Sequence, residues 1–256
     1  MPAPAIMKSD SADLVEVFSS IQGEGALVGR GQIFIRFLGC NLSCDYCDTN
    51  STVNDDKCSL ELTPGRRDFH EMKNPVAMEK ILELVTRWNG GWPSVHHSIS
   101  LTGGEPLLHL DVLQEWLVRL RAILPLHLET NGVLHNALFA VIRHIDYVSM
   151  DIKLPSSSGE TSLWEHHREF LAIAAGTELS VKVVVNSSTE HWEISRAAEM
   201  VAAIAPDAPF IIQPETKGDV SLAISMLELL ELQEIASRTV RDVRIIPQTH
   251  RFMGML

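Results

Sequence analysis

The sequence has no run of about 18 uninterrupted apolar residues, and residues 1–10 lack a basic stretch followed by an apolar one. A membrane-spanning helix and a secretory leader are therefore not expected. Basic residues are also scarce, with 21 lysines and arginines against 33 aspartates and glutamates and a net charge of −12. This balance argues against a broad nucleic-acid-binding surface or attachment to an anionic membrane. We therefore expect a cytoplasmic protein that binds neither nucleic acid nor membrane.

Cysteine is scarce as well, with four residues in a chain of 256. In a reducing compartment, so few cysteines are more often metal ligands or free thiols than halves of disulfides.

No internal repeat or low-complexity tract marks a boundary, and 45% of the residues are apolar. The length and composition predict a single domain, residues 1–256, with a sizeable core.

Apolar runs alternate with amphipathic stretches, which is the pattern of a parallel α/β sheet or barrel. We expect strands at 33–38, 98–102, 126–130, 145–151, 180–185, 209–213 and, more briefly, 243–246. We expect helices at 76–88, 110–122, 136–143, 162–175, 191–204 and 221–238. Residues 51–75 are charged, contain proline and glycine and show no clear period, so they are interpreted as an insert or mobile loop.

Four of the predicted strands end in polar residues. They run into "TGGEP" (102–106), "ETNG" (129–132), "SMDIK" (149–153) and "QPET" (213–216). In a parallel βα barrel, the carboxyl ends of the strands form the reactive face. One such ending would be ordinary loop chemistry, but four indicate a shared site.

Cys40, Cys44 and Cys47 form a C-x3-C-x2-C motif directly after the first predicted strand. A structural zinc site needs four Cys or His ligands, usually in two pairs, and no second pair is present. Thiolates also hold iron–sulfur clusters, which normally take four. Three thiolates can hold three irons of a [4Fe–4S] cluster and leave the fourth iron open. Cys58 is interpreted as a free thiol, because a fourth cysteine would block that iron.

The motif "CNLSCDYC" (40–47) resembles that of the radical S-adenosylmethionine (SAM) superfamily, including the aromatic residue before its last cysteine. The resemblance implies that SAM chelates the open iron and that its reductive cleavage gives a 5′-deoxyadenosyl radical. "TGGEP" resembles the superfamily's GGEP motif, which contacts the SAM amino group, although adjacent glycines can also be only a turn. Each polar residue at the later strand ends could equally cap a helix or form a turn. The residues that the resemblance assigns to SAM are Gly103, Gly104, Glu105, Glu129, Thr130, Asn131, Ser149, Asp151, Lys153, Gln213, Pro214, Glu215 and Thr216.

Two charged side chains fall inside otherwise apolar strands. Arg36 alternates with apolar residues in "FIRFLGC" (34–40), and a buried arginine is costly unless it is paired. It forms an internal salt bridge, with Glu24 as a candidate partner, or it binds a substrate carboxylate in bidentate fashion. Lys182 lies in "SVKVVV" (180–185), where we expect a structural pair with Asp151 or Glu129.

"SIQGEG" (20–25), "FIRFLGCNLSCDYCDT", "TGGEP", "ETNG", "SMDIK" and the tail "PQTHRFMGML" together resemble the 7-carboxy-7-deazaguanine synthase family of queuosine and 7-deazapurine biosynthesis. The resemblance implies a partial, modified (β/α)6 TIM-like barrel and a homodimer. It implies a lyase that contracts the ring of 6-carboxy-5,6,7,8-tetrahydropterin and releases ammonia. The cofactors implied are a [4Fe–4S] cluster, regenerated SAM and Mg²⁺, with a flavodoxin or ferredoxin as electron donor.

The same resemblance assigns residues to the substrate and to Mg²⁺. Thr49 matches the family's magnesium ligand, and one neutral oxygen suits an ion that retains several waters; it could instead cap a short helix. The tail ends in apolar residues that either pack under the barrel or fold over its open face and exclude water. The residues assigned to the pterin are Ile21, Gln22, Gly23, Glu24, Arg36, Thr102 and the terminal Leu256.

Two other functions fit the cysteine motif. A radical SAM activase that installs a glycyl radical on a protein partner would share the cysteines and the GGEP-like loop. It would not need an arginine beside a "QGEG" loop. A non-enzymatic iron–sulfur or zinc scaffold would bind metal without an effect of SAM on its spectrum.

Overall fold

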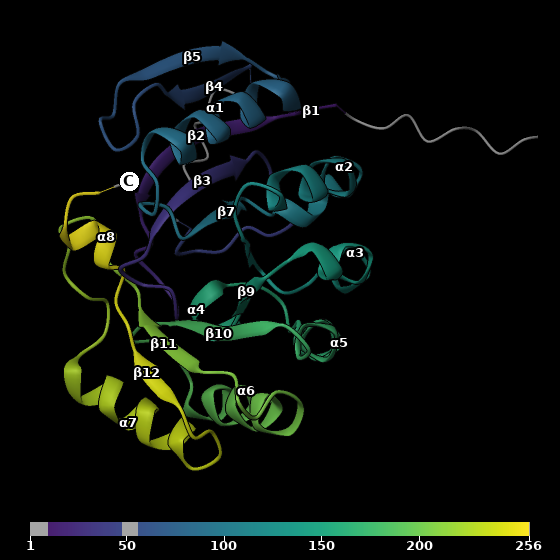
Figure 1. Ribbon diagram of the computed structural model, residues 1–256. Coiled ribbons are helices and arrows are strands. Elements are labelled where there is room, and N and C mark those ends of the chain that lie inside the picture. The colour runs from purple at the N-terminus through teal and green to yellow at the C-terminus, as the bar shows by residue number, and fades with distance from the viewer. Residues whose placement is uncertain (1–9, 48–55, 256) are drawn as a thin grey trace, which may run out of the picture.

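The computed structural model of the protein describes residues 10–47 and 56–255. Within them, ten strands form one sheet in the order β12-β11-β10-β9-β8-β7-β3-β2-β4-β5, and β1 pairs with β6 separately. In Figure 1 the main sheet runs from β5 at the top to β12 at the bottom. The strands are β1 Ser11–Ala12, β2 Leu14–Ile21, β3 Gly31–Phe37, β4 Lys57–Glu61, β5 Phe69–Lys73, β6 Val76–Ala77, β7 Ser98–Gly103, β8 Leu126–Thr130, β9 Tyr147–Ile152, β10 Glu178–Val185, β11 Phe210–Pro214 and β12 Val243–Ile245.

The strands from β3 through β7, β8, β9, β10, β11 to β12 are parallel neighbours in chain order. Parallel neighbours need crossover connections, and right-handed crossovers place successive helices on the same face. Figure 1 shows α2, α3, α5 and α6 on one side of this sheet, which leaves the other side for a site. The helices are α1 Met78–Gly91, η1 Pro106–His109, α2 Leu110–Arg121, α3 His135–Val141, η2 Ile142–His144, α4 Pro155–Ser158, α5 Trp164–Ala174, α6 His191–Ile204, α7 Met226–Ser237 and α8 Thr249–Phe252.

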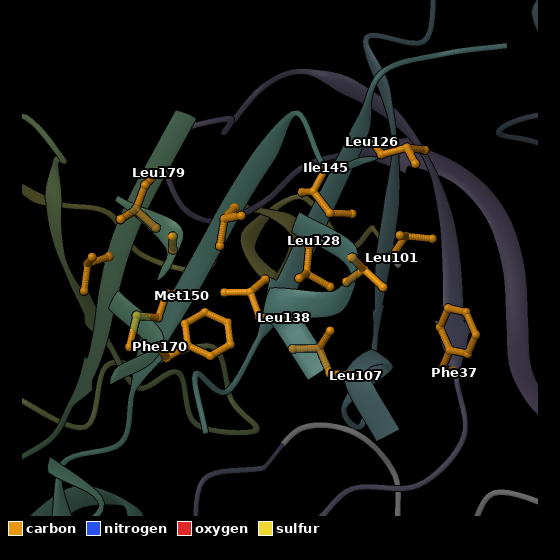
Figure 2. Packing of buried hydrophobic residues seen from close by; sticks show 14 of the residues in the cluster. Phe37, Leu101, Leu107, Leu126, Leu128, Leu138, Ile145, Met150, Phe170 and Leu179 are labelled. Carbon is orange, nitrogen blue, oxygen red and sulfur yellow. The ribbon is translucent and has the colours of Figure 1, made fainter. Parts of the chain in front are cut away.

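The core lies between this sheet and its helices. Successive side chains of a strand point to opposite faces, so every second residue of the parallel strands can meet the helices. Figure 2 shows Leu101, Leu128 and Met150 from neighbouring strands packed with Leu138 and Phe170 of the covering helices. The predicted α/β barrel architecture is confirmed, with all seven predicted strands and six predicted helices in place.

The N-terminal part of the sheet differs from a plain βα repeat. Strand β2 pairs antiparallel with β3, and β4 and β5 form a hairpin whose β4 lies parallel to β2. The described part of segment 51–75 is therefore not an irregular loop, because β4 and β5 extend the main sheet. Its status as an insert stays a prediction. Cys58 of β4 is completely buried in the core.

Candidate active site

A cavity of about 880 Å³ lies against the inner face of the sheet, at the carboxyl ends of the parallel strands. Its size is that of a site for one or two small organic molecules. Glu105 and Pro214 do not line it, and Thr49 and Leu256 lie outside the described residues. The predicted site residues that line it are Ile21, Gln22, Gly23, Glu24, Arg36, Cys40, Cys44, Cys47, Thr102, Gly103, Gly104, Glu129, Thr130, Asn131, Ser149, Asp151, Lys153, Gln213, Glu215 and Thr216.

The loop that follows β3 brings its three cysteines to one cavity. Cys47 N donates to Cys44 O (3.0 Å), which closes a turn between the last two cysteines. Residues beyond β9 support the loop from outside, because Asp45 N donates to Ser158 O (2.9 Å) and Ser43 N to Glu160 (2.5 Å). Within the described residues, no three His, Cys, Asp or Glu side chains converge on a single metal ion. Because each cluster thiolate binds a different iron, a cluster does not require such convergence.

The two glycines of "TGGEP" lie against the backbone of the cysteine loop. Gly103 has φ +124°, and a Cβ on it would overlap the backbone of Phe37. A Cβ on Gly104 would overlap the carbonyl oxygen of Gly39 and lie 3.0 Å from Cys40 N. The absence of a Cβ at these glycines, which the sequence predicts to admit a ligand, also admits the chain that carries Cys40.

Glu105 joins two strand ends beneath the cavity. Its carboxylate accepts from Asn131 N (2.8 Å), Leu107 N (3.0 Å) and Thr130 Oγ1 (2.9 Å). Burial raises the pKa of Glu105 to about 7, although these hydrogen bonds oppose the shift. Glu105 therefore fixes the ends of β7 and β8 from behind, and its predicted contact with SAM stays a prediction.

Four charged side chains form a chain along one wall of the cavity. Lys153 Nζ lies 2.8 Å from Asp151 Oδ2, and Lys182 Nζ lies 3.6 Å from the same oxygen. Lys182 also forms a closer ion pair with Glu24. The predicted pair with Asp151 is thus confirmed, whereas Glu129 is not a partner of Lys182 because it hydrogen-bonds Gln22 and Ser100 instead.

The pairing keeps this wall ionised. Burial alone would raise the pKa of Glu24, but the charge and hydrogen bond of Lys182 lower it to about 2. Burial alone would lower the pKa of Lys153, but Asp151 raises it well above its ordinary value. The cavity wall therefore carries both signs of charge at neutral pH and suits a zwitterionic ligand.

Arg36 lines the cavity from β3, on the face expected from parity. Its partner is Glu16, at 2.8 Å from Nε, and not Glu24 as we had considered. The register of the β2–β3 pair explains this, since Glu16 lies opposite Arg36. Phe18 lies under the guanidinium at 5.8 Å. The hydrogen bond to Glu16 uses one of the five N–H donors of Arg36, which leaves the others for a ligand carboxylate.

The C-terminal segment meets the "QGEG" loop across the open side of the sheet. Thr249 N donates to Gly23 O (2.9 Å), and Gln248 Nε2 donates to Glu24 Oε1 (2.9 Å). His250 lines the cavity and fills the space that a Cβ of Gly23 would occupy. The sequence singled out the tail but missed both Gln248 and His250 as cavity residues.

Two apolar residues of the tail, Phe252 and Met253, do not pack in the core. Phe252 is 50% exposed and Met253 is 52% exposed. Packing under the barrel is therefore wrong for these two residues. Arg67 Nη2 of the hairpin donates to Gly254 O (2.6 Å), which places the tail against the β4–β5 turn, as Figure 1 also shows.

His167 of α5 was not predicted as a site residue, yet it is completely buried behind the cavity. Its Nδ1–H donates to Gly132 O (3.0 Å), and Nε2 accepts from Lys153 N (3.1 Å). Burial lowers the pKa of His167 to about 4, so the ring is neutral and can accept. The ring of His167 therefore links the backbone that follows β8, at Gly132, to the backbone that follows β9, at Lys153.

Several buried polar atoms of the cavity have no hydrogen-bond partner within the described residues. They are Asp151 Oδ1, Gln213 Oε1 and Thr216 Oγ1. Buried polar atoms are normally satisfied, and orphaned ones call for an explanation such as a ligand. These atoms belong to cavity residues that the resemblance assigned to SAM, so the residues present fit a polar cofactor.

Comparisons with known proteins find relatives that span almost the whole chain. The model of the Radical SAM superfamily matches residues 34–190. A 7-carboxy-7-deazaguanine synthase from Geobacter sulfurreducens is 55% identical over 250 residues, covering 98% of this chain and 100% of the relative. One from Methanothermobacter thermautotrophicus is 37% identical, covering 95% and 98%. The crystal structure of QueE from Escherichia coli shares the fold, with TM-score 0.57, 22% identity and coverage of 94% and 95%. Among the described residues, no helix is both long and apolar enough to cross a membrane.

Proposed function

The chain belongs to the 7-carboxy-7-deazaguanine synthase family of the radical SAM superfamily, and from this we propose its reaction and the roles of its residues. The enzyme converts 6-carboxy-5,6,7,8-tetrahydropterin to 7-carboxy-7-deazaguanine and ammonia. Substrate and product differ only by the elements of ammonia, so no net oxidant is consumed and SAM can be regenerated. The product enters queuosine or 7-deazapurine biosynthesis.

The observation that carries this proposal is the shared cavity. The cysteine loop, the strand-end residues assigned to SAM, the "QGEG" loop and Arg36 all line one space of about 880 Å³. An activase for a protein partner would not need the last two features. A metal-binding scaffold would not need a polar cavity with unpartnered atoms next to the cysteines. The arrangement therefore supports a small-molecule substrate next to SAM.

The cofactors are assigned to the residues that fit them. Cys40, Cys44 and Cys47 would hold the [4Fe–4S] cluster, and the unpartnered oxygens of Asp151 and Gln213 are among the groups that would hold SAM. When bound, the cluster and SAM supply the radical that abstracts hydrogen from the substrate. Mg²⁺ would bind near Thr49, outside the described residues. A homodimer, a flavodoxin or ferredoxin as electron donor, and the cytoplasm as location complete the proposal.

The chain's own side chains bind and orient the substrate. Arg36 is placed to pair with the pterin carboxylate through its remaining N–H donors. Gln22 and Glu129, which are hydrogen-bonded to each other at 3.1 Å, also line the cavity and offer acceptors to the pterin. His250 and the tail segment lie over the open side, where they exclude water from a reactive intermediate.

The test is the product formed anaerobically from 6-carboxytetrahydropterin, SAM and reductant by the reconstituted protein. We expect 7-carboxy-7-deazaguanine and ammonium in equal amounts, with several turnovers for each SAM consumed. Mass spectrometry of the pterin-derived product and an ammonium assay measure both. Cleavage of SAM without any change in the pterin would reject the proposed substrate.

We expect Arg36→Ala to weaken pterin binding strongly while SAM binding persists. Loss of this partly buried partner leaves the substrate carboxylate unpaired, which costs roughly 2–5 kcal/mol. Arg36→Lys retains the charge but loses the planar guanidinium group. Its affinity for the pterin should therefore lie between those of the native protein and Arg36→Ala. Pterin KM and SAM dissociation constants measure the effect. Equal losses of thermal stability and SAM binding would mean that Arg36 serves only its salt bridge with Glu16.

A further inference from the structure

Asn131, which directly follows β8, contacts the start of the cysteine loop with its side chain. The residue is only 6% exposed. Its Nδ2 lies 2.8 Å from Oδ1 of Asn41 and 3.8 Å from Sγ of Cys40. Sulfur is a larger acceptor than oxygen, so an N–H···S hydrogen bond is longer than an N–H···O one. One side chain beyond β8 therefore reaches two successive residues of the loop that follows β3.

The orientation of the Asn131 amide is set by the backbone. The N–H of Val133 can only donate, and it points at Oδ1 of Asn131 over 3.2 Å. The NH2 group must therefore face the cysteine loop, where one N–H donates to Asn41 and the other is left for Cys40. The backbone N–H of Asn131 donates to the buried carboxylate of Glu105 (2.8 Å), which holds the residue in place.

The sulfur of Cys40 also accepts an N–H from its own loop, because Leu42 N lies 3.5 Å from it. A [4Fe–4S] cluster gains one negative charge on reduction, and N–H donors to its thiolates stabilise that charge. Hydrogen bonds to the sulfurs are therefore among the factors that set the reduction potential of a cluster. The donor from Leu42 is part of the loop backbone, whereas the donor from Asn131 can be removed by one substitution.

Resting on the proposed ligation of the cluster by three cysteines, we propose that Asn131 is a positioning residue that acts through Cys40. Its N–H donor to the Cys40 sulfur raises the reduction potential of the bound cluster. The resemblance assigned Asn131 to SAM. Both N–H donors of its side chain face the cysteine loop instead, which leaves neither of them for the carboxylate of SAM.

Asn131→Ser removes the donor and keeps the local turn. A serine hydroxyl can accept from the N–H of Val133, as the amide does, but it is too short to reach Cys40. At a fixed potential, we expect the ratio of reduced to oxidised cluster to fall about three- to tenfold, the net effect of one hydrogen bond. A tenfold fall corresponds to about 59 mV for a one-electron couple. A loop that only loosened would expose the cluster to water, which stabilises the reduced charge and raises the potential.

Asn131→Asp is a second test that keeps the shape of the side chain. It retains an acceptor for Val133 N but replaces the NH2 group by a negative charge near the Cys40 sulfur. The potential should therefore fall further than in Asn131→Ser, because the reduced cluster is the more negative state.

The matched control is Asn186→Ser, because Asn186 forms the same local turn after β10. Its Oδ1 accepts from Ser188 N (2.9 Å), and its Nδ2 donates to Glu215 Oε2 (2.8 Å) instead of reaching a cysteine. Its loss should leave the potential of the cluster at the native value.

The experiment is a redox titration of the anaerobically reconstituted proteins without SAM or pterin. Visible absorbance and the EPR signal of the reduced cluster give the midpoint potential. Iron content, the SAM dissociation constant and thermal unfolding are measured on every variant. We expect a lower potential in both Asn131 variants, a native potential in Asn186→Ser and native SAM affinity in Asn131→Ser.

An unchanged or higher potential in Asn131→Ser, or an equal fall in Asn186→Ser, would overturn the proposal. Weakened SAM binding at a native potential would assign Asn131 to SAM. Failure of both Asn131 variants to take up iron would mean that the residue holds the loop and does not tune the cluster. Turnover of 6-carboxytetrahydropterin is assayed on the same native preparation. Its absence would remove the proposed substrate, whereas the potentials would still decide the role of Asn131.

Discussion

Cys44→Ala is expected to lose the iron–sulfur chromophore and all cleavage of SAM, whereas Cys58→Ala is expected to keep both. Cys40, Cys44 and Cys47 lie on one loop that lines the cavity. A cluster with an open iron already has one ligand fewer than usual, so the loss of a second leaves two irons without a thiolate. Iron and sulfide content, visible absorbance and 5′-deoxyadenosine formation measure the outcome under anaerobic conditions.

Cys58 is the matched control, because it is the cysteine that the cavity excludes. It lies on β4 with its side chain completely buried in the core. Burial, together with the nearby charge of Glu16, raises the pKa of the Cys58 thiol to about 12, so it is protonated and inert. Cys58→Ala should cost about 1 kcal/mol of unfolding free energy, as for the loss of one buried group. Loss of iron from Cys58→Ala would contradict ligation by three cysteines.

The parallel part of the fold could be predicted from the sequence because its signals are local. A strand such as "SISLT" or "LHLET" places apolar residues at every second position against the helices, and each connecting helix has its own 3.6-residue period. The N-terminal strand β2 and the β4–β5 hairpin were missed. Segment 51–75 is charged and lacks such a period, so nothing local indicated that β4 would pair with a strand some 40 residues earlier.

Charge pairing could not be predicted, because it depends on which strands become neighbours. Lys182 and Glu24 are 158 positions apart, and Gln248 and Glu24 are 224 apart. Lys182 and Arg36 both line the cavity. The choice of partner required the register of β2 against β3 and the path of the tail, which are tertiary properties.

The sequence itself contained a pattern that indicates the polar residues beneath the cavity. In "SISLT", "LHLET" and "DYVSMD" the residues between the apolar ones are serine, histidine, glutamate and aspartate. Strands covered on both faces by apolar layers normally read as continuous hydrophobic runs. Polar residues at alternate positions of neighbouring strands therefore indicated a hydrated or ligand-filled interior. Ser98, Ser100 and His127 could have been found in this way.

Gly104→Ala is expected to prevent assembly of the cluster, although it removes no ligand. The added Cβ would overlap the carbonyl oxygen of Gly39 and lie 3.0 Å from Cys40 N. Gly104 cannot move away from the cysteine loop without loss of hydrogen bonds, because Gly104 N donates to Phe37 O (3.2 Å) and Glu105 N donates to Gly39 O (2.9 Å). The variant must break these hydrogen bonds or displace the loop that starts at Cys40. Overpacking of this kind typically costs about 1–3 kcal/mol.

The measurement is cluster content after anaerobic reconstitution, beside thermal unfolding, with Gly90→Ala as control. Gly90 lies in α1 with nothing within 4 Å of an added Cβ, so alanine there should stabilise by about 0.5–1 kcal/mol through helix propensity. The result separates two roles of the glycine pair. If Gly104 served only as a SAM contact, the variant would keep its cluster and bind SAM weakly. Because its backbone is pressed against the loop of Cys40, we expect the cluster itself to be lost.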